Sequence, residues 1–188
     1  MADELLKLGP YRWIVLRQTG DAMLLVTSGI IEQRAYHGSK VPVTWETCTV
    51  RRYLNEELWR EAFSYNERQR VLLTCVENAD NQWFNTPGGN ETEDRLFLLS
   101  LAEVVTLFGD SGQLVGKNPR SKLFINDSFK QGRIAMRGAT RAHWWLRSPG
   151  LRETCAADVF PGGAVHVGGH HVTNVAMGGI RPALWLRV

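Results

Sequence analysis

The chain has 188 residues, of which 44% are hydrophobic and 22% are charged, and this composition is ordinary for one globular domain with a substantial core. Its net charge of +3 is small and its arginines are spread out, so nucleic acid is not an expected partner. The N-terminal residues have no signal-peptide pattern, and no run approaches the roughly 20 apolar residues of a membrane span. We therefore expect a cytoplasmic protein whose cysteines Cys48, Cys75 and Cys155 are reduced.

The N-terminal third predicts a hairpin followed by a helix. Residues Tyr11–Arg17 and Ala22–Ser28 are apolar segments joined by the turn Thr19-Gly20-Asp21, which is a hairpin signal. Residues Thr49–Phe63 place apolar side chains at helical spacing on one face. A two-stranded hairpin and an amphipathic helix of about 15 residues are therefore expected in this order.

The middle of the chain predicts short elements and a long loop. Two Ser-x-x-Glu capping boxes predict helices over Ser64–Thr74 and Ser100–Gly109. Residues Arg95–Leu99 predict a short strand, and the acidic block Pro87–Asp94 is interpreted as the turn that leads into it rather than as a calcium loop. Residues Asp110–Arg141 are polar, rich in glycine and weakly patterned, so they are expected to be mostly loop.

Two well-patterned blocks, Trp144–Gly150 and Gly178–Leu186, enclose an irregular tail, Leu151–Met177. The seven tryptophans are expected to be mostly core, and Arg147 and Arg181 are interpreted as internal donors to backbone carbonyls or to carboxylates such as Glu46 or Asp94. Alternation in the last block predicts a final strand with one buried face. Inside the tail, small and β-branched residues recur at short spacing and predict a structural framework: Ala156, Ala157, Val159, Gly162, Val165, Gly169 and Val172.

These blocks resemble the C-terminal half of the bacterial and phage DUF6273 family. The segments Tyr11–Leu16, Val43–Trp59 and Thr86–Ser100 fit the same family, so the resemblance covers nearly the whole chain. The resemblance implies an α+β protein with a C-type-lectin-like fold, in which two or three helices surround small mixed or antiparallel sheets and the two termini meet in one sheet. It implies a single domain, 1–188, with the tail as its variable region.

Many members of this family resemble variable proteins of diversity-generating retroelements, in which a mutagenic reverse transcriptase rewrites adenines in a C-terminal cassette. If both adenines of an AAC or AAT codon change freely, Gln, Glu, Lys, Met and Trp cannot be produced. Between Leu151 and Ala176 only Glu153 belongs to that unreachable set, although Lys, Gln and Trp all occur upstream. The tail composition therefore agrees with diversification.

The tail contains residue types that can bind a metal ion. His166, His170 and His171 are near one another, and zinc could use two of them, with Asp158 nearby. If Val165 and Val167 point inward, His166 points outward, and His170 and His171 point to opposite sides. Because no carboxylate or cysteine stands at a clear ligand spacing, exposed surface histidines are favoured and no metal or other cofactor is expected.

Nucleophilic chemistry is disfavoured as well. Ser148 and Cys155 have no base at a recognisable spacing. Formylglycine-generating enzymes, which share the fold implied by the resemblance, use cysteines in this part of the chain, but here Cys155 is alone. An enzyme of that kind, or a metal-dependent one, remains the alternative from another functional class, and an undiversified phage or structural binding protein is a third.

The sequence thus predicts a non-enzymatic, variable ligand-binding protein, either cytoplasmic or part of a phage particle. Its partner is expected to be a protein or a cell-surface component of unknown identity, and the oligomeric state is open. We expect six framework residues, which we call the struts, to be buried: Ala157, Val159, Val165, Val172, Ile180 and Leu184. We expect four residues between them to be exposed on one face: Arg152, Phe160, His166 and His170. The predicted ligand-binding residues are Leu151, Arg152, Thr154, Cys155, Asp158, Phe160, Pro161, His166, Gly168, His170, His171, Thr173, Asn174 and Ala176.

Overall fold

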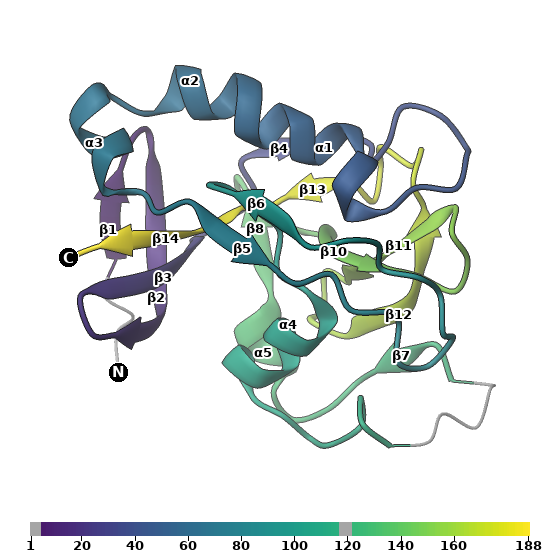
Figure 1. Ribbon diagram of the computed structural model, residues 1–188. Helices are drawn as coiled ribbons and strands as arrows, with labels where there is room; N and C mark the ends of the chain where they lie inside the picture. Colours follow the sequence, from purple (N-terminus) through teal and green to yellow (C-terminus); the bar gives the residue numbers. More distant parts are fainter. Residues whose placement is uncertain (1–4, 117–121) are drawn as a thin grey trace.

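A computed structural model describes residues 5–116 and 122–188 and confirms a mixed α+β fold with several small antiparallel sheets (Figure 1). In one sheet the strand order is β1 (Leu5–Leu8), β2 (Tyr11–Thr19), β3 (Ala22–Thr27) and β14 (Ala183–Arg187). The predicted hairpin is β2–β3, and Gly20 at its turn has a φ of +57°, which favours glycine. The first and last described strands therefore lie in the same sheet, as predicted.

The predicted helix over residues 49–63 is confirmed as one helical run. It comprises α1 (Thr49–Arg52), a π-helical stretch η2 (Tyr53–Leu58) and α2 (Trp59–Ala62). The run crosses above the sheets (Figure 1) and turns Val50 and Leu54 into the core, where both are fully buried. Burial of this apolar stripe, more than helix propensity, holds such short segments in place.

Both capping boxes are confirmed. The Ser64 and Ser100 side chains accept hydrogen bonds from the backbone N–H three residues on, at the starts of α3 (Tyr65–Arg70) and α4 (Leu101–Phe108). Gly109, with a φ of +116°, ends α4 as predicted. The expected continuation of α3 to Thr74 is wrong, because the chain becomes extended at residue 71 and then forms β5 (Thr74–Val76).

The predicted strand over Arg95–Leu99 is also wrong. The strand that forms there is β6 (Thr92–Asp94), and it pairs with β5. The Asn55 side chain accepts the backbone N–H groups of residues 95 and 96 and donates to the carbonyl of residue 96, replacing a neighbouring strand. Phe97 then forms an isolated bridge with Ala183, so the segment remains buried without being a regular strand.

As expected, the described part of the segment 110–141 is mostly loop; its residues 117–121 lie outside the described residues. Four short elements occur in it: β7 (Phe124–Ile125), α5 (Lys130–Arg133), β8 (Ala135–Arg137) and β9 (Thr140–Ala142). The strand β7 pairs with β12 of the tail, whereas β8 and β9 pair with each other as a local hairpin. All four elements are too short to leave a clear periodicity in the sequence, so the sequence predicts none of them individually.

The two strands of the tail, β11 (Cys155–Val159) and β12 (Val165–His171), form a second sheet together with β10 (Trp144–Pro149) and β7, in the order β10, β11, β12 and β7 (Figure 1). All its pairings are antiparallel. Two short strands, β4 (Glu32–Gln33) and β13 (Gly179–Ile180), pair with each other beside this sheet. A 3₁₀ turn, η1 (Trp45–Thr47), precedes α1. No described helix has the length and apolar composition that a membrane crossing requires.

The core is rich in tryptophan. Four of the seven tryptophans are fully buried, namely Trp13, Trp45, Trp144 and Trp145, so the prediction of a mostly buried set is confirmed. In the final strand β14, Ala183 is as fully buried as Leu184. The predicted buried face is confirmed, since Leu184 and Leu186 are fully buried, while the opposite face goes from buried Ala183 through half-buried Trp185 to exposed Arg187.

The two arginines of the blocks that flank the tail, Arg147 and Arg181, donate to backbone carbonyls, as predicted. Arg147 Nη1 donates to the carbonyl of residue 98 at 2.8 Å, and Arg181 Nε donates to that of residue 27 at 3.0 Å. The expected carboxylate partners are wrong. Arg147 pairs with Glu103 of α4, whereas Asp94 accepts hydrogen bonds from Trp45 Nε1 at 2.8 Å and from Arg51 Nε at 2.7 Å.

Candidate functional site

The predicted framework of the tail is confirmed at its alanines and valines, whereas Gly169 is half-buried and Gly162 is exposed. Val159 and Val165 face each other in the β11–β12 pair and point into the core. All six struts are fully buried: Ala157, Val159, Val165, Val172, Ile180 and Leu184. The tail is therefore anchored by its small and β-branched residues, whose rigid side chains suit a packed sheet.

The positions between the struts differ in exposure. Leu151, Arg152, His171 and Ala176 are exposed. A second set is half-buried: Thr154, Cys155, Phe160, Pro161, His170, Thr173 and Asn174. Three predicted ligand-binding residues are buried instead of displayed: Asp158, His166 and Gly168.

His166 does lie on the sheet face opposite its valine neighbours, but other rings cover it. Phe124 of β7 stacks on its imidazole with ring centroids 4.4 Å apart and an interplanar angle of 15°. Phe160 and His170 approach it at centroid distances of 5.2 and 4.7 Å. Alternation predicted the direction of this side chain correctly, but it carried no information about these neighbours, so the predicted exposure was wrong.

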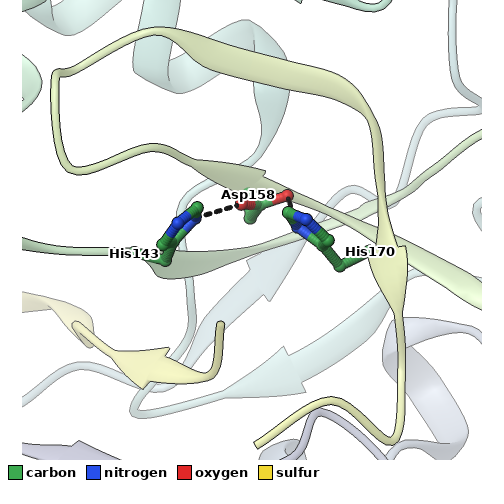
Figure 2. A group of neighbouring side chains, drawn as sticks. All are labelled: His143, Asp158 and His170. Atoms are coloured by element: carbon green, nitrogen blue, oxygen red, sulfur yellow. Dashed lines mark hydrogen bonds and ion pairs between the residues drawn. The ribbon is translucent and has the colours of Figure 1, made fainter. Parts of the chain in front are cut away.

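Asp158 is the centre of this group. Its fully buried carboxylate accepts hydrogen bonds from three imidazoles: His143 Nδ1 to Oδ2 at 3.1 Å, and His166 Nδ1 and His170 Nδ1 to Oδ1 at 3.0 and 2.9 Å. An ionised carboxylate only accepts, so each of the three rings carries its proton on Nδ1. Figure 2 shows His143 and His170 on either side of the carboxylate. We call Asp158, the three histidines, Phe124 and Phe160 the Asp158 cluster.

Strand register assembles the cluster. Asp158 of β11 is paired with His166 of β12, and Ala156 with His170, so four steps along β12 match two along β11. The irregularity contains Gly169, whose φ is +68° and where a Cβ would lie 2.1 Å from the carbonyl oxygen of Ala156. Only glycine fits there, and the bulge brings His170 back to Asp158.

The cluster is partly open to solvent. The side chains of His143 and His170 are 14% and 24% exposed, whereas that of His166 is only 9% exposed. Phe160 contacts the His143 ring at a centroid distance of 4.5 Å and that of His170 at 5.7 Å. The result is an apolar rim with two imidazole edges at the surface, above one buried negative charge.

Burial alone would raise the pKa of the Asp158 carboxyl, but the three imidazole hydrogen bonds outweigh it and hold that pKa well below its usual range. The hydrogen bond to Asp158 raises the pKa of His170, with burial opposing it. The buried carboxylate of Asp158 thus stays ionised beneath the surface, and its negative charge attracts cations.

The remaining tail positions gather at the other end of the strands. Cys155 Sγ lies 3.9 Å from His171 Nδ1, and Val172 donates its N–H to the carbonyl of Thr154 at 3.0 Å. Arg152 accepts a backbone hydrogen bond from Cys155 and lies in this loop, which adjoins the end of β12. His170 and His171 thus have different surroundings, as predicted, but Arg152 does not join Phe160, His166 and His170 in the cluster.

The residues considered as nucleophiles have structural surroundings. Burial raises the pKa of the Cys155 thiol, which lowers its thiolate fraction and hence its reactivity. Ser148 is buried, and its Oγ accepts the backbone N–H of Leu101 in the first turn of α4. The three cysteines are free, as expected for reduced thiols.

Sequence reasoning missed His143 and Phe124. His143 lies one residue before the block Trp144–Gly150 and two before Trp145, and this spacing places it on the same strand face as Trp145. That alternation was a usable signal. Phe124 carried none, because its strand exists only through pairing with β12.

The family model described as "Domain of unknown function (DUF6273)" matches residues 20–188. The chain therefore belongs to the DUF6273 family. No curated protein and no solved structure matches it.

Proposed function

We propose that this DUF6273 protein is a variable ligand-binding protein of a diversity-generating retroelement. The observation that carries the proposal is the tail itself. Fully buried struts alternate with side chains of unrelated chemistry, and only Glu153 between Leu151 and Ala176 falls outside the set reachable from an AAC or AAT codon. A fixed framework beneath replaceable positions is what a display surface requires.

The proposed scaffold is a C-type-lectin-like fold. Three features support it: the first and last described strands share one sheet, a long helical run crosses above the sheets, and the tail forms a separate sheet (Figure 1). In this arrangement the tail sheet rests on the core through β10, and its loops and outer face can change without disturbing the pairing of the terminal strands.

Binding would use two surfaces of different character. The Asp158 cluster offers Phe160 and the edges of His143 and His170, and rings supply contact area at low cost in conformational entropy. The loop around Arg152, with exposed Leu151 and His171, offers a guanidinium, an aliphatic side chain and an imidazole. Such a mixed surface suits a protein or another cell-surface component, and the chain acts by binding rather than by catalysis.

Two matched libraries test this proposal. The first randomises the exposed residues Leu151, Arg152, His171 and Ala176 with NNC and NNT codons, and the second randomises the struts Ala157, Val159, Val165 and Val172 in the same way. Most members of the first library should fold and resist protease, since exposed changes usually cost within about 0.5 kcal/mol. Most of the second should not, because core substitutions cost about 1–3 kcal/mol each.

The same libraries, sorted against an unrelated target protein, address binding itself. We expect binders from the first library and none from the second. Equal losses of folded protein in both libraries, or a folded first library that yields no binder to several targets, would contradict a display surface at these positions.

A further inference from the structure

We propose that His143, Asp158 and His170 form a binding site for one divalent transition-metal ion of the zinc class, with a fourth coordination position open to solvent. This site goes beyond the proposed display function and does not depend on it. His143 comes from the segment before β10, and Asp158 and His170 come from β11 and β12 (Figure 2).

The donor spacing fits tetrahedral coordination. One ligand atom from each residue lies within 4.8 Å of the other two. The contacts from His143 Nδ1 and His170 Nδ1 to the carboxylate are 3.1 and 2.9 Å. Metal–ligand bonds of about 2.0–2.1 Å in a tetrahedron separate neighbouring ligand atoms by roughly 3.3 Å. An ion between the three groups thus requires only small side-chain shifts.

The donor chemistry selects the ion. Two imidazoles and one carboxylate suit Zn²⁺, Co²⁺ or Ni²⁺, whereas Mg²⁺ and Ca²⁺ prefer oxygen ligands alone. Each of the two imidazoles donates Nδ1–H to the carboxylate, so ligation through Nδ1 takes that proton from Nδ1 and leaves it on Nε2 of the ring. The ion takes the place of the two Nδ1 protons beside the Asp158 carboxylate. The negative charge of this carboxylate therefore partly neutralises the positive charge of the bound ion.

The surroundings complete the site. His166 Nδ1 donates to Asp158 Oδ1 at 3.0 Å and can keep doing so when the ion is bound, which orients the carboxylate. Phe160 lies against the His143 ring and Phe124 against that of His166, so apolar groups limit water around the donors. His166 is therefore a positioning residue, and the exposed edges of His143 and His170 leave the fourth position accessible.

The test uses the full chain, freed of metal by chelator and titrated calorimetrically with zinc chloride. We expect about one equivalent of Zn²⁺ to bind. The substitutions His143→Gln, Asp158→Asn and His170→Gln should each weaken binding at least about 100-fold, and His166→Gln about 10–100-fold, as for partners behind a ligand. Bound Co²⁺ should give the intense visible absorption of four-coordinate geometry and lose it in the three ligand variants.

His171→Gln is the matched control, because it removes an exposed imidazole next to His170 that lies near Cys155 instead of Asp158. It should change zinc affinity less than about threefold. Circular dichroism of the metal-free variants checks their folding, and His143→Gln and His170→Gln, at the more exposed positions, suffice if Asp158→Asn does not fold. The proposal is overturned if the parent chain binds no zinc, or if His171→Gln weakens binding as much as His170→Gln.

Discussion

Replacing Trp145 with alanine is expected to lower the free energy of unfolding by about 3–5 kcal/mol, the range for large aromatic truncations in a core. Trp145 is fully buried, meets Tyr36 edge-on with ring centroids 5.8 Å apart, and donates Nε1–H to the carbonyl of Arg34 at 3.1 Å. The alanine variant therefore leaves both a cavity and an unpaired carbonyl. Chemical denaturation measures the loss.

The double variant Arg152→Ala, His171→Ala is the control for Trp145→Ala, because both side chains are exposed. Its cost should stay at or below about 1 kcal/mol. His166 and His170 are unsuitable controls, since their removal takes two donors from the buried Asp158 carboxylate. Similar losses for Trp145→Ala and the control would mean that the division of this region into scaffold and surface is wrong.

Replacing Arg147 with alanine should cost a comparable amount, about 3–5 kcal/mol, because two backbone carbonyls lose a buried charged donor, at about 1–3 kcal/mol each, and a partly exposed ion pair is broken as well. The guanidinium donates to the carbonyls of Leu98 and Glu77 at 2.8 and 3.1 Å and pairs with Glu103. It thereby joins β10 to the segment before α4 and to the start of that helix. The alanine variant leaves all three acceptors without this donor.

Arg147→Lys should recover part of the loss, since an ammonium keeps the charge but lacks the planar fork that reaches three acceptors. Arg141→Ala removes an exposed arginine from the same region and should cost within about 0.5 kcal/mol. Urea denaturation of the three variants measures these differences. An Arg147→Ala variant as stable as Arg141→Ala would show that the hydrogen bonds of Arg147 contribute little to the fold.

Local signals predicted much of this fold. The capping boxes at Ser64 and Ser100, the turn at Gly20 and the buried struts of the tail were all readable from spacing, because each depends on residues close in sequence. Features that depend on distant partners were not readable. The Asn55 side chain, some 40 residues before Leu96, forms hydrogen bonds with the backbone N–H and carbonyl groups of Leu96. In a regular strand these groups would pair with a neighbouring strand.

The candidate site likewise has a part that was predictable from local sequence and a part that depends on distant residues. Asp158, His166 and His170 could be named from the tail, but their assembly depends on the β11–β12 bulge, on His143 from the segment before β10 and on Phe124 from β7. Hydrophobic alternation predicts a side chain's direction and not what covers it. This is why His166 was expected at the surface and is buried beneath two phenyl rings.

The nucleotide sequence of the gene and its surroundings tests the proposed diversification most directly. Leu151, Arg152, Thr154 and Thr173 are the informative positions, because their codons can end in any base, whereas Asp, Phe, His and Asn codons always end in C or T. We predict C or T at all four, and a nearby template repeat with AAC or AAT at these codons and an unchanged Glu153. Codons such as CGG or AGA for Arg152 and CTG or TTG for Leu151, without a template repeat, would contradict diversification and leave the tail as a fixed surface.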